Sequence, residues 1–421
     1  MHHFEYKNGE MNCEDVPIRL IAKEVGTPFY CYSQATLTRH VNAFLDPFSS
    51  SDALICYAVK ANSNLAILNL LFRLGCGADI VSGGELFRVL KAGVDPKKVV
   101  YSGVGKTKEE IGKALKAGIL SLNIESAQEL KVVSEVARSL NLQAPIAIRV
   151  NPDIDPKTHP YISTGLLHNK FGIPIEDAIA LFLQASKDPN LRISGIDCHI
   201  GSQVTELGPF IDAVRSIKKV ILYLKEHGIS LSHLDLGGGL GIAYREEEPP
   251  HPRDYAKAVI EEIKDLNFTL ILEPGRTIVG NAGILVTEVL YTKQTPVKKF
   301  IIVDAAMNDL IRPGLYNAYH EILPVMDHSK KRSEMVDVVG PVCETGDFLA
   351  RDREMMPVNP GELLAVMSAG AYGFSMASNY NSRQRGAEVL VNGDKFSVIR
   401  TRESLQDLVL GESLPPWEHP P

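Results

Sequence analysis

A single lysine ends an apolar run and is the first residue of this chain whose chemistry needs an explanation. Lys60 follows the run 53–59 and is followed at once by Ala61-Asn62-Ser63-Asn64. A lysine ammonium is strongly hydrated and usually lies on a solvated surface. Burial at a strand end would lower the pKa of the amine, and an uncharged amine can form a Schiff base with a carbonyl compound. The alternative is a lysine that snorkels to solvent at a strand terminus.

A histidine motif and a glycine triplet also follow apolar runs. In His199-Ile200-Gly201-Ser202 the imidazole offers a flat face for an aromatic ligand, and Ser202 offers a hydroxyl. In Leu236-Gly237-Gly238-Gly239-Leu240-Gly241, successive glycines would let backbone N–H groups approach an anion such as phosphate. The alternatives are a structural histidine and a tight turn that needs positive φ.

The motif Glu273-Pro274-Gly275-Arg276 places a carboxylate and a guanidinium at the end of another run. Glu273 could bond a pyridinium nitrogen and keep it protonated, which makes such a ring an electron sink. Gly275 offers a backbone amide to an anion, and Arg276 can hold a carboxylate through two parallel hydrogen bonds. A solvated turn with a Glu–Arg pair is the alternative.

These motifs are positioned by short apolar runs that alternate with amphipathic stretches of helical period. Buried strands that alternate with helices predict parallel βαβ units, and eight such units close a (β/α)8 TIM-type barrel. The eight runs are 54–59, 78–81, 99–102, 120–123, 146–150, 195–199, 234–236 and 270–273. In a barrel the strand ends converge on one face, where active sites are built. A doubly wound open sheet is the structural alternative.

After about residue 283 the pattern becomes mostly β, with a hairpin turn expected at Asn392-Gly393. The strand-like segment 27–32 could complete this second domain. We therefore predict a barrel over residues 36–283 and a β-rich domain formed by residues 1–35 and 284–421.

The β-rich region holds further candidate site residues. Cys343 could donate a proton, and Glu344 beside it could accept an ammonium group. Tyr372 lies in the small-residue segment 369–374 and could bond a phosphate or a substrate, while Arg312 and Tyr316 add another cation and phenol. A turn with a buried thiol is the alternative for Cys343.

Composition narrows the function classes. The net charge is -7 over 421 residues, which argues against nucleic acid as a partner. No apolar stretch is long enough to span a membrane. The six cysteines show no metal-type spacing, so no metal site is expected, and free thiols favour a cytoplasmic protein.

The ordered set of motifs resembles a known family. The segment 57–62, the His199 motif, the glycine triplet, the Glu273 motif and Cys343-Glu344 are similar to the alanine-racemase-fold (type III) pyridoxal-phosphate-dependent decarboxylases, and most similar to the diaminopimelate decarboxylases among them. The resemblance covers about residues 25 to 400. It implies decarboxylation of meso-2,6-diaminopimelate to L-lysine by a homodimer with shared active sites.

The resemblance also implies a role for each matching residue. Catalytic roles fall to Lys60, which binds pyridoxal 5'-phosphate covalently, to His199, which stacks on its ring, and to Cys343. The implied cofactor-binding residues are Lys60, His199, Ser202, Gly238, Gly239, Glu273, Gly275, Arg276 and Tyr372. The implied substrate-binding residues are Arg276, Arg312, Tyr316, Glu344 and Tyr372, with Cys343 and Glu344 supplied by the partner subunit.

The motifs also bear on three alternative functions. Racemases of this fold place an arginine at the ring nitrogen, and Glu273 argues against them. Ornithine and arginine decarboxylases carry an aspartate after the cysteine, whereas Glu344 and Arg312 favour a substrate with a distal carboxylate. A vitamin carrier would resemble the barrel half only. A lid is expected over residues 151–172.

Overall fold

The computed structural model describes residues 2–49, 51–154, 169–328, 332–415 and 417. Two compact units are present, one formed by residues 36–280 and the other by residues 1–35 and 281–421. Most of the expected lid falls on residues 155–168, which lie outside the described residues.

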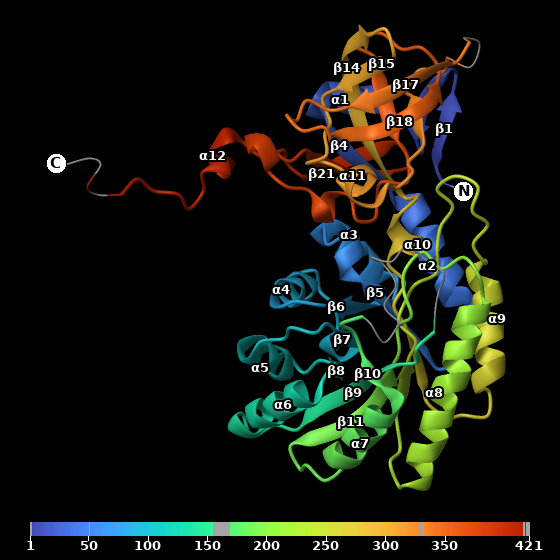
Figure 1. Cartoon of the computed structure of the whole chain (residues 1–421), viewed down its shortest axis with the longest axis vertical. Helices are drawn as coiled ribbons and strands as arrows, with labels where there is room; N and C mark the ends of the chain where they lie inside the picture. The colour runs from blue at the N-terminus through green and yellow to red at the C-terminus, as the bar shows by residue number, and fades with distance from the viewer. Residues whose placement is uncertain (1, 50, 155–168, 329–331, 416, 418–421) are drawn as a thin grey trace. The chain divides into compact units, whose positions relative to one another are not determined.

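The first unit is a closed barrel of eight parallel strands (Figure 1), which confirms the (β/α)8 prediction. Around the barrel the order is β5-β6-β7-β8-β9-β11-β12-β13, and β13 pairs with β5 to close the ring. Each expected run contributes a strand because it is short, apolar and able to bury both faces. The strands are β5 (Ala53–Ala58), β6 (Gly77–Ile80), β7 (Val99–Tyr101), β8 (Ser121–Ile124), β9 (Ala144–Asn151), β11 (Leu191–Asp197), β12 (His233–Asp235) and β13 (Thr269–Leu272), with the short β10 (Ile173–Pro174) beside β9.

Helices lie on the outside of these strands (Figure 1). Several begin at a side chain that caps the first turn: the Asn64, Ser82 and Ser126 side chains each accept a backbone N–H, and Thr107 forms a capping box with Glu110. Such caps fix where each strand-to-helix turn ends. The elements are α2 (Gln34–Phe48), η1 (Val59–Ala61), α3 (Leu65–Arg73), α4 (Gly83–Lys91), η2 (Pro96–Lys98), α5 (Lys108–Ala117), α6 (Ala127–Ser139), α7 (Ile175–Ala185), α8 (Gly208–Glu226), α9 (Pro252–Ile263) and α10 (Arg276–Val279).

The second unit is mostly β, and the N-terminal segment completes it as expected. Strand β4 (Phe29–Ser33) lies between β14 (Gly283–Gln294), to which it is antiparallel, and β20 (Ala387–Asn392), to which it is parallel. Their inward side chains, among them Phe29, Ile284 and Val389, form one buried cluster. Burial of these apolar surfaces ties the two ends of the chain into one unit.

The remaining elements of this unit surround that core. The predicted hairpin forms between β20 and β21 (Lys395–Arg400). The other strands are β1 (Phe4–Lys7), β2 (Glu10–Cys13), β3 (Val16–Pro17), β15 (Lys299–Val303), β16 (Ile322–Pro324), β17 (Glu334–Val339), β18 (Phe348–Met355) and β19 (Leu363–Val366). The helical segments are α1 (Ile18–Val25), α11 (Arg312–Tyr316), η4 (Phe374–Met376), η5 (Tyr380–Ser382) and α12 (Leu405–Leu408).

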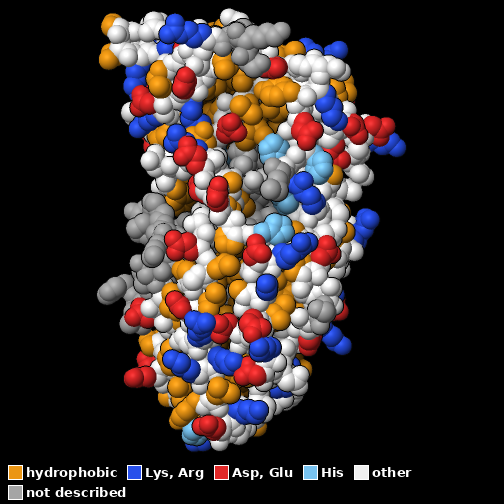
Figure 2. All heavy atoms as spheres, turned by 90° about the vertical axis from the view of Figure 1, so that its right-hand side faces the viewer, with side chains coloured by type: hydrophobic (Ala, Val, Ile, Leu, Met, Phe, Trp, Pro, Cys, Tyr) orange, Lys and Arg blue, Asp and Glu red, His pale blue; other side chains and the backbone are white. Residues whose placement is uncertain are grey.

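Charge is mixed over the surface. On the face shown in Figure 2 the described Lys and Arg side chains are interspersed with Asp and Glu. Among the helices of the described residues, none combines the length and apolar character that a membrane crossing requires.

Candidate active site

Lys60 lies in η1, directly after barrel strand β5, and its ammonium forms an ion pair. Lys60 Nζ is 2.7 Å from Asp79 Oδ2, which comes from the neighbouring strand β6. The Lys60 side chain is 36% exposed, whereas Asp79 is fully buried. Lys60 is therefore partly desolvated, between the buried and the solvent-facing alternatives that the sequence left open. A buried carboxylate balances its charge.

Four buried carboxyl groups lie in the barrel near this lysine. Asp79, Asp197, Asp235 and Glu273 come from four different strands or strand ends, and all are at most 5% exposed. Charges of the same sign in a desolvated interior repel one another strongly. The three aspartates were not expected from the sequence. Each stood as a lone charged residue inside an apolar run, and that signal could have identified them.

Glu273 is a member of this cluster whose surroundings favour the protonated carboxyl group. Burial raises its pKa well above the usual value, and the charges of Asp235, Asp79 and Asp197 raise it further, while Lys60 opposes the shift. Burial raises the pKa of Asp235 to about 6, against a hydrogen bond from the Gly237 N–H to Oδ1 at 2.9 Å. Both carboxyl groups therefore hold a proton more readily than a solvated acid does.

Glu273 and Asp235 each have a carboxyl oxygen that lacks a hydrogen-bond donor among the described residues. Glu273 Oε1 and Asp235 Oδ2 are buried and have no geometric hydrogen-bond partner among the described residues. A buried acceptor without a donor costs about 1–3 kcal/mol. A cationic N–H group from a ligand would supply a donor and offset the negative charge of the cluster at the same time.

His199 lies beside the glycine triplet. Its Nδ1 accepts the Gly238 backbone N–H at 3.2 Å, which places the ring proton on Nε2. Removal from solvent lowers the pKa of the imidazole well below its usual value, and the charges of Arg149 and Lys60 add to the effect. The ring is therefore neutral at neutral pH.

The glycines of the triplet are required by close backbone approach. A Cβ on Gly238 would lie 2.2 Å from the Glu273 carbonyl oxygen, and one on Gly239, where φ is +114°, would lie 2.4 Å from the Gly201 carbonyl oxygen. Gly275 packs against Ala58, with 3.0 Å from its ideal Cβ to that side chain. The structure thus brings the three glycine-containing motifs together at one end of the barrel.

Arg276 begins the short helix α10 and is 6% exposed. Its guanidinium donates to Ser202 Oγ at 3.0 Å and to Tyr244 Oη at 2.7 Å. Ser202 and Arg276 were both expected at the site, and they are in direct contact. Tyr244 was not expected, because nothing in its local sequence distinguishes it from a surface tyrosine.

Arg149 is a second buried cation, at the end of β9. Its guanidinium donates to Glu125 Oε1 at 2.8 Å and lies 3.7 Å from Asp197 Oδ2. Burial opposes the charge of Arg149, but Glu125, Asp197 and Glu273 outweigh it, so its pKa is raised. This arginine therefore offsets part of the negative charge of the acidic cluster.

In the β-rich unit, Arg312 and Tyr316 lie in α11. Arg312 is buried, its Nε donates to His320 Nε2 at 3.3 Å, and its guanidinium lies 5.8 Å from the centre of the Tyr316 ring. Tyr372 has φ of 55°, a left-handed conformation that bulky residues seldom adopt. Such conformations persist where the surroundings enforce them, often at functional sites.

Cys343 and Glu344 lie in the exposed turn between β17 and β18. The Cys343 N–H donates to Asn381 Oδ1 at 3.1 Å, and Glu344 Oε2 accepts from Tyr380 Oη at 2.7 Å. The thiol of Cys343 is exposed, so the alternative of a buried thiol in a turn is wrong.

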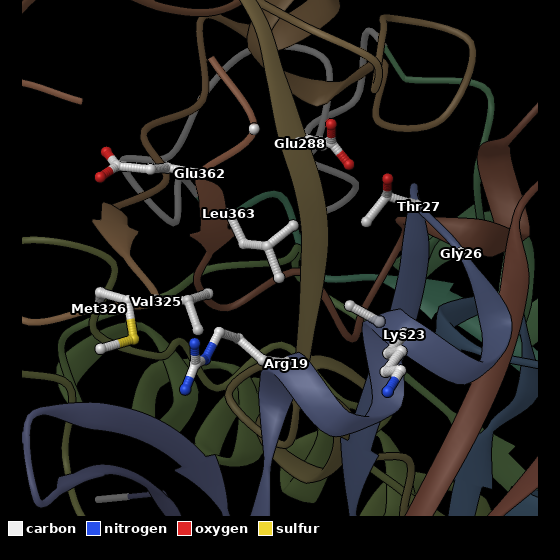
Figure 3. A pocket seen from close by; sticks show the side chains of 11 residues that line it. Arg19, Lys23, Gly26, Thr27, Glu288, Val325, Met326, Glu362 and Leu363 are labelled. Atoms are coloured by element: carbon white, nitrogen blue, oxygen red, sulfur yellow. The ribbon is translucent and has the colours of Figure 1, made fainter. Parts of the chain in front are cut away.

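A separate pocket of about 370 Å³ lies in the β-rich unit beside α1 (Figure 3). Arg19 and Lys23 line it on the helix, with Glu288 and Glu362 opposite. It contains none of the residues that the sequence indicated for chemistry. Within the described residues, no group of three or more His, Cys, Asp or Glu side chains is arranged to hold a metal ion.

Comparisons with known proteins agree with this geometry. Residues 34–280 match the family model described as "Pyridoxal-dependent decarboxylase, pyridoxal binding domain". A diaminopimelate decarboxylase of Pseudomonas aeruginosa is 52% identical over 99% of this chain and 100% of that protein. Among solved structures, diaminopimelate decarboxylase of M. jannaschii in complex with L-lysine has a TM-score of 0.94 at 40% identity, covering 99% and 100% of the two chains. The Helicobacter pylori enzyme with L-lysine has a TM-score of 0.90 at 46% identity, covering 93% and 98%.

Proposed function

Because this chain belongs to the diaminopimelate decarboxylases, a family of pyridoxal-dependent enzymes, we propose that it converts meso-2,6-diaminopimelate into L-lysine and carbon dioxide. The observation that carries the proposal is Glu273. Its carboxyl is buried, its pKa is raised, and one of its oxygens has no geometric donor among the described residues. The site therefore suits a protonated ring nitrogen.

The barrel residues fit pyridoxal 5'-phosphate. When bound, this cofactor supplies an electron sink that accepts the electron pair left when carbon dioxide departs. Glu273 would keep the ring nitrogen protonated, and the neutral imidazole of His199 would stack on the ring. The Lys60 amine would hold the cofactor covalently, and Asp79 Oδ2 accepts a hydrogen bond from Lys60 Nζ at 2.7 Å.

The phosphate would be held by backbone amides and by two side chains. Gly239 and Gly275 would offer main-chain N–H groups to the anion. The N–H of Gly238 donates to His199 Nδ1 at 3.2 Å, so Gly238 would line the cofactor site through its backbone and hold the His199 ring. Ser202 and Arg276 are already in hydrogen-bond contact and would add a hydroxyl and a cation. Tyr372 would contribute a phenol to the cofactor or the substrate.

Substrate recognition requires groups for a distal carboxylate and a distal ammonium. We assign the carboxylate to Arg276 and Arg312 and the ammonium to Glu344, with Tyr316 and Tyr372 as further proposed substrate-binding residues. A substrate that lacks the distal carboxylate would leave a buried arginine without its ligand, which costs several kcal/mol. This cost would select diaminopimelate over ornithine.

The last proton transfer completes the reaction. After carbon dioxide leaves, the α-carbon must receive one proton, and the Cys343 Sγ–H is the proposed donor, with Lys60 Nζ as the alternative. The resulting thiolate regains its proton from water. No oxidant or reductant is consumed, because the electron pair of the broken C–C bond becomes that of the new C–H bond.

We further propose a homodimer in which Cys343 and Glu344 of the partner subunit complete each site. Their exposure at the tip of a turn suits such an exchange. Mixing Lys60→Ala with Cys343→Ala subunits tests it, because a two-fold dimer of shared sites would regain about a quarter of wild-type activity from two inactive variants. Activity that stays at the level of either variant alone would refute shared sites.

The substrate assignment is tested by carbon dioxide release from a panel of amino acids. Purified protein with pyridoxal phosphate is assayed on meso-diaminopimelate, ornithine, arginine and D-alanine. We expect turnover of meso-diaminopimelate alone at appreciable rate. Preferential turnover of ornithine or arginine would overturn the assignment in favour of the related basic amino-acid decarboxylases.

A further inference from the structure

The turn that carries Cys343 and Glu344 is held by a second segment of the β-rich unit, η5. Tyr380 Oη donates to Glu344 Oε2 at 2.7 Å. The next residue, Asn381, accepts the Cys343 N–H through its side-chain oxygen at 3.1 Å. Two consecutive residues of η5 therefore contact the two consecutive residues proposed to act on the substrate.

The base of the turn is built independently of η5. Asp347 is 4% exposed, and its carboxylate accepts the Val342 N–H and the Met307 N–H, each at 2.7 Å. Within the turn, the Glu344 N–H donates to the Val342 carbonyl at 2.8 Å. These bonds shape the turn, but they leave the Glu344 carboxylate and the Cys343 amide to be oriented by Tyr380 and Asn381.

Two residues of η5 have a left-handed backbone conformation. Asn381 has φ of 55° and ψ of 29°, and Ser382 has φ of 54°. Asparagine tolerates this left-handed region better than most residues. Tyr380 is 45% exposed, so little burial energy fixes its ring.

Anchors on both sides of η5 hold it in place. On one side Asn379 Nδ2 donates to Glu403 Oε2 at 2.6 Å. On the other side Arg383 Nε donates to Asn308 Oδ1 at 3.0 Å, and Asn308 is 1% exposed. A strained segment fixed at both ends can act as a rigid support for the turn.

We infer that Tyr380 and Asn381 are positioning residues for the decarboxylation, an inference that rests on the proposed function. By binding Oε2, Tyr380 orients the Glu344 carboxylate so that Oε1 is directed to the substrate ammonium. By binding the Cys343 amide, Asn381 fixes the main chain from which the thiol delivers its proton. The hydrogen bond from Tyr380 to Glu344, together with the Glu344 charge, raises the pKa of Tyr380, which keeps the phenol a donor.

Tyr380→Phe removes only the hydroxyl group and tests whether Tyr380 orients the Glu344 carboxylate. Loss of a hydrogen bond to a charged group corresponds to about a tenfold effect, so we expect KM for meso-diaminopimelate to rise about tenfold. We expect kcat to change less than about twofold and the melting temperature to stay unchanged, since exposed side chains contribute little to stability. Tyr291→Phe, at a tyrosine of β14 that is 66% exposed, is the matched control and should alter neither constant.

The role of Asn381 in holding the Cys343 main chain is tested with two substitutions. Both replacing residues, glycine and aspartate, tolerate positive φ. Asn381→Gly keeps the backbone conformation and removes the acceptor, and we expect kcat to fall about tenfold. Asn381→Asp keeps an acceptor oxygen and should restore kcat to near the wild-type value. Equal loss in both variants would show that Asn381 acts only through backbone stability.

A double variant separates the positioning role from other effects. If Tyr380 acts through Glu344, then Tyr380→Phe added to Glu344→Gln should raise KM no further. Calorimetric binding of L-lysine to the holoenzyme gives a readout without turnover, and Tyr380→Phe should weaken it by the same factor as KM. Absence of wild-type activity on meso-diaminopimelate would refute the proposed function. Wild-type activity with KM and lysine affinity unchanged in Tyr380→Phe would refute the positioning role alone.

Discussion

Replacement of Asp235 by asparagine is expected to stabilise the cofactor-free barrel above pH 6. Asp235 is fully buried, and its pKa is about 6 in the folded protein against 3.8 in the unfolded chain. Between these values the unfolded state loses its proton while the folded state keeps it, so stability falls as pH rises and then levels off. The difference of about two pKa units corresponds to about 3 kcal/mol.

The Asp235→Asn variant avoids this loss of stability at high pH and keeps the hydrogen bond from the Gly237 N–H. An amide oxygen can still accept the Gly237 N–H that Oδ1 accepts at 2.9 Å. For a domain of this size, about 3 kcal/mol corresponds to a rise in melting temperature of roughly 6–12 °C. Urea or thermal unfolding of cofactor-free protein at pH 4, 5, 6 and 7 measures the change, which should be absent at pH 4 and largest at pH 7.

The control is Asp212→Asn, at an exposed residue of α8, which should change stability by less than about 0.5 kcal/mol at every pH. If Asp235→Asn lowered stability at pH 7, or left the pH dependence of unfolding as in the wild type, then repulsion within the acidic cluster would not be the dominant effect.

Three further predictions follow from other parts of the two units. Glu273→Gln should lower kcat on meso-diaminopimelate about 100-fold, because one preorganised charge contact to the ring is lost; a change within twofold would contradict the role of Glu273. Asp309→Asn should remove the fall in stability of the β-rich unit between pH 4 and pH 7, since burial raises the pKa of Asp309 to about 7; an unfolding midpoint with unchanged pH dependence would contradict this. Gly239→Ala should weaken pyridoxal phosphate binding at least about tenfold in an absorbance titration, because the new Cβ would meet the Gly201 carbonyl oxygen. The control Gly228→Ala should not weaken binding, since Gly228 also has positive φ but no atom lies within 4 Å of its Cβ position.

The sequence predicts the barrel well because its signals are local. Each of the eight runs is short and apolar, and helices begin at capping side chains such as Asn64 and Ser82 that follow the strands directly. The motifs at Lys60, His199 and Glu273 could be placed at one end of the barrel from the strand order alone. Each depends on its position after a strand and not on distant partners.

What the sequence does not predict depends on pairing over long distances. The sheet of β1, β2 and β3 and the strand β18 were not expected, because they are short or strongly polar and need partners elsewhere in the chain. The hydrogen bond between Tyr380 and Glu344, which are 36 residues apart, has no local signature. The partial exposure of Lys60 and its ion pair with Asp79 of the next strand likewise depend on tertiary packing, which the local sequence does not show.

Lys60 is the residue that we propose to carry the cofactor. Borohydride reduction of the holoenzyme, followed by proteolysis and mass spectrometry of the peptides, would trap the cofactor on the amine that holds it. We expect the phosphopyridoxyl group on Lys60, in the peptide that continues through Ala61-Asn62, and its absence from Lys60→Ala protein. Stoichiometric label on a different lysine, or none on any lysine, would contradict the account.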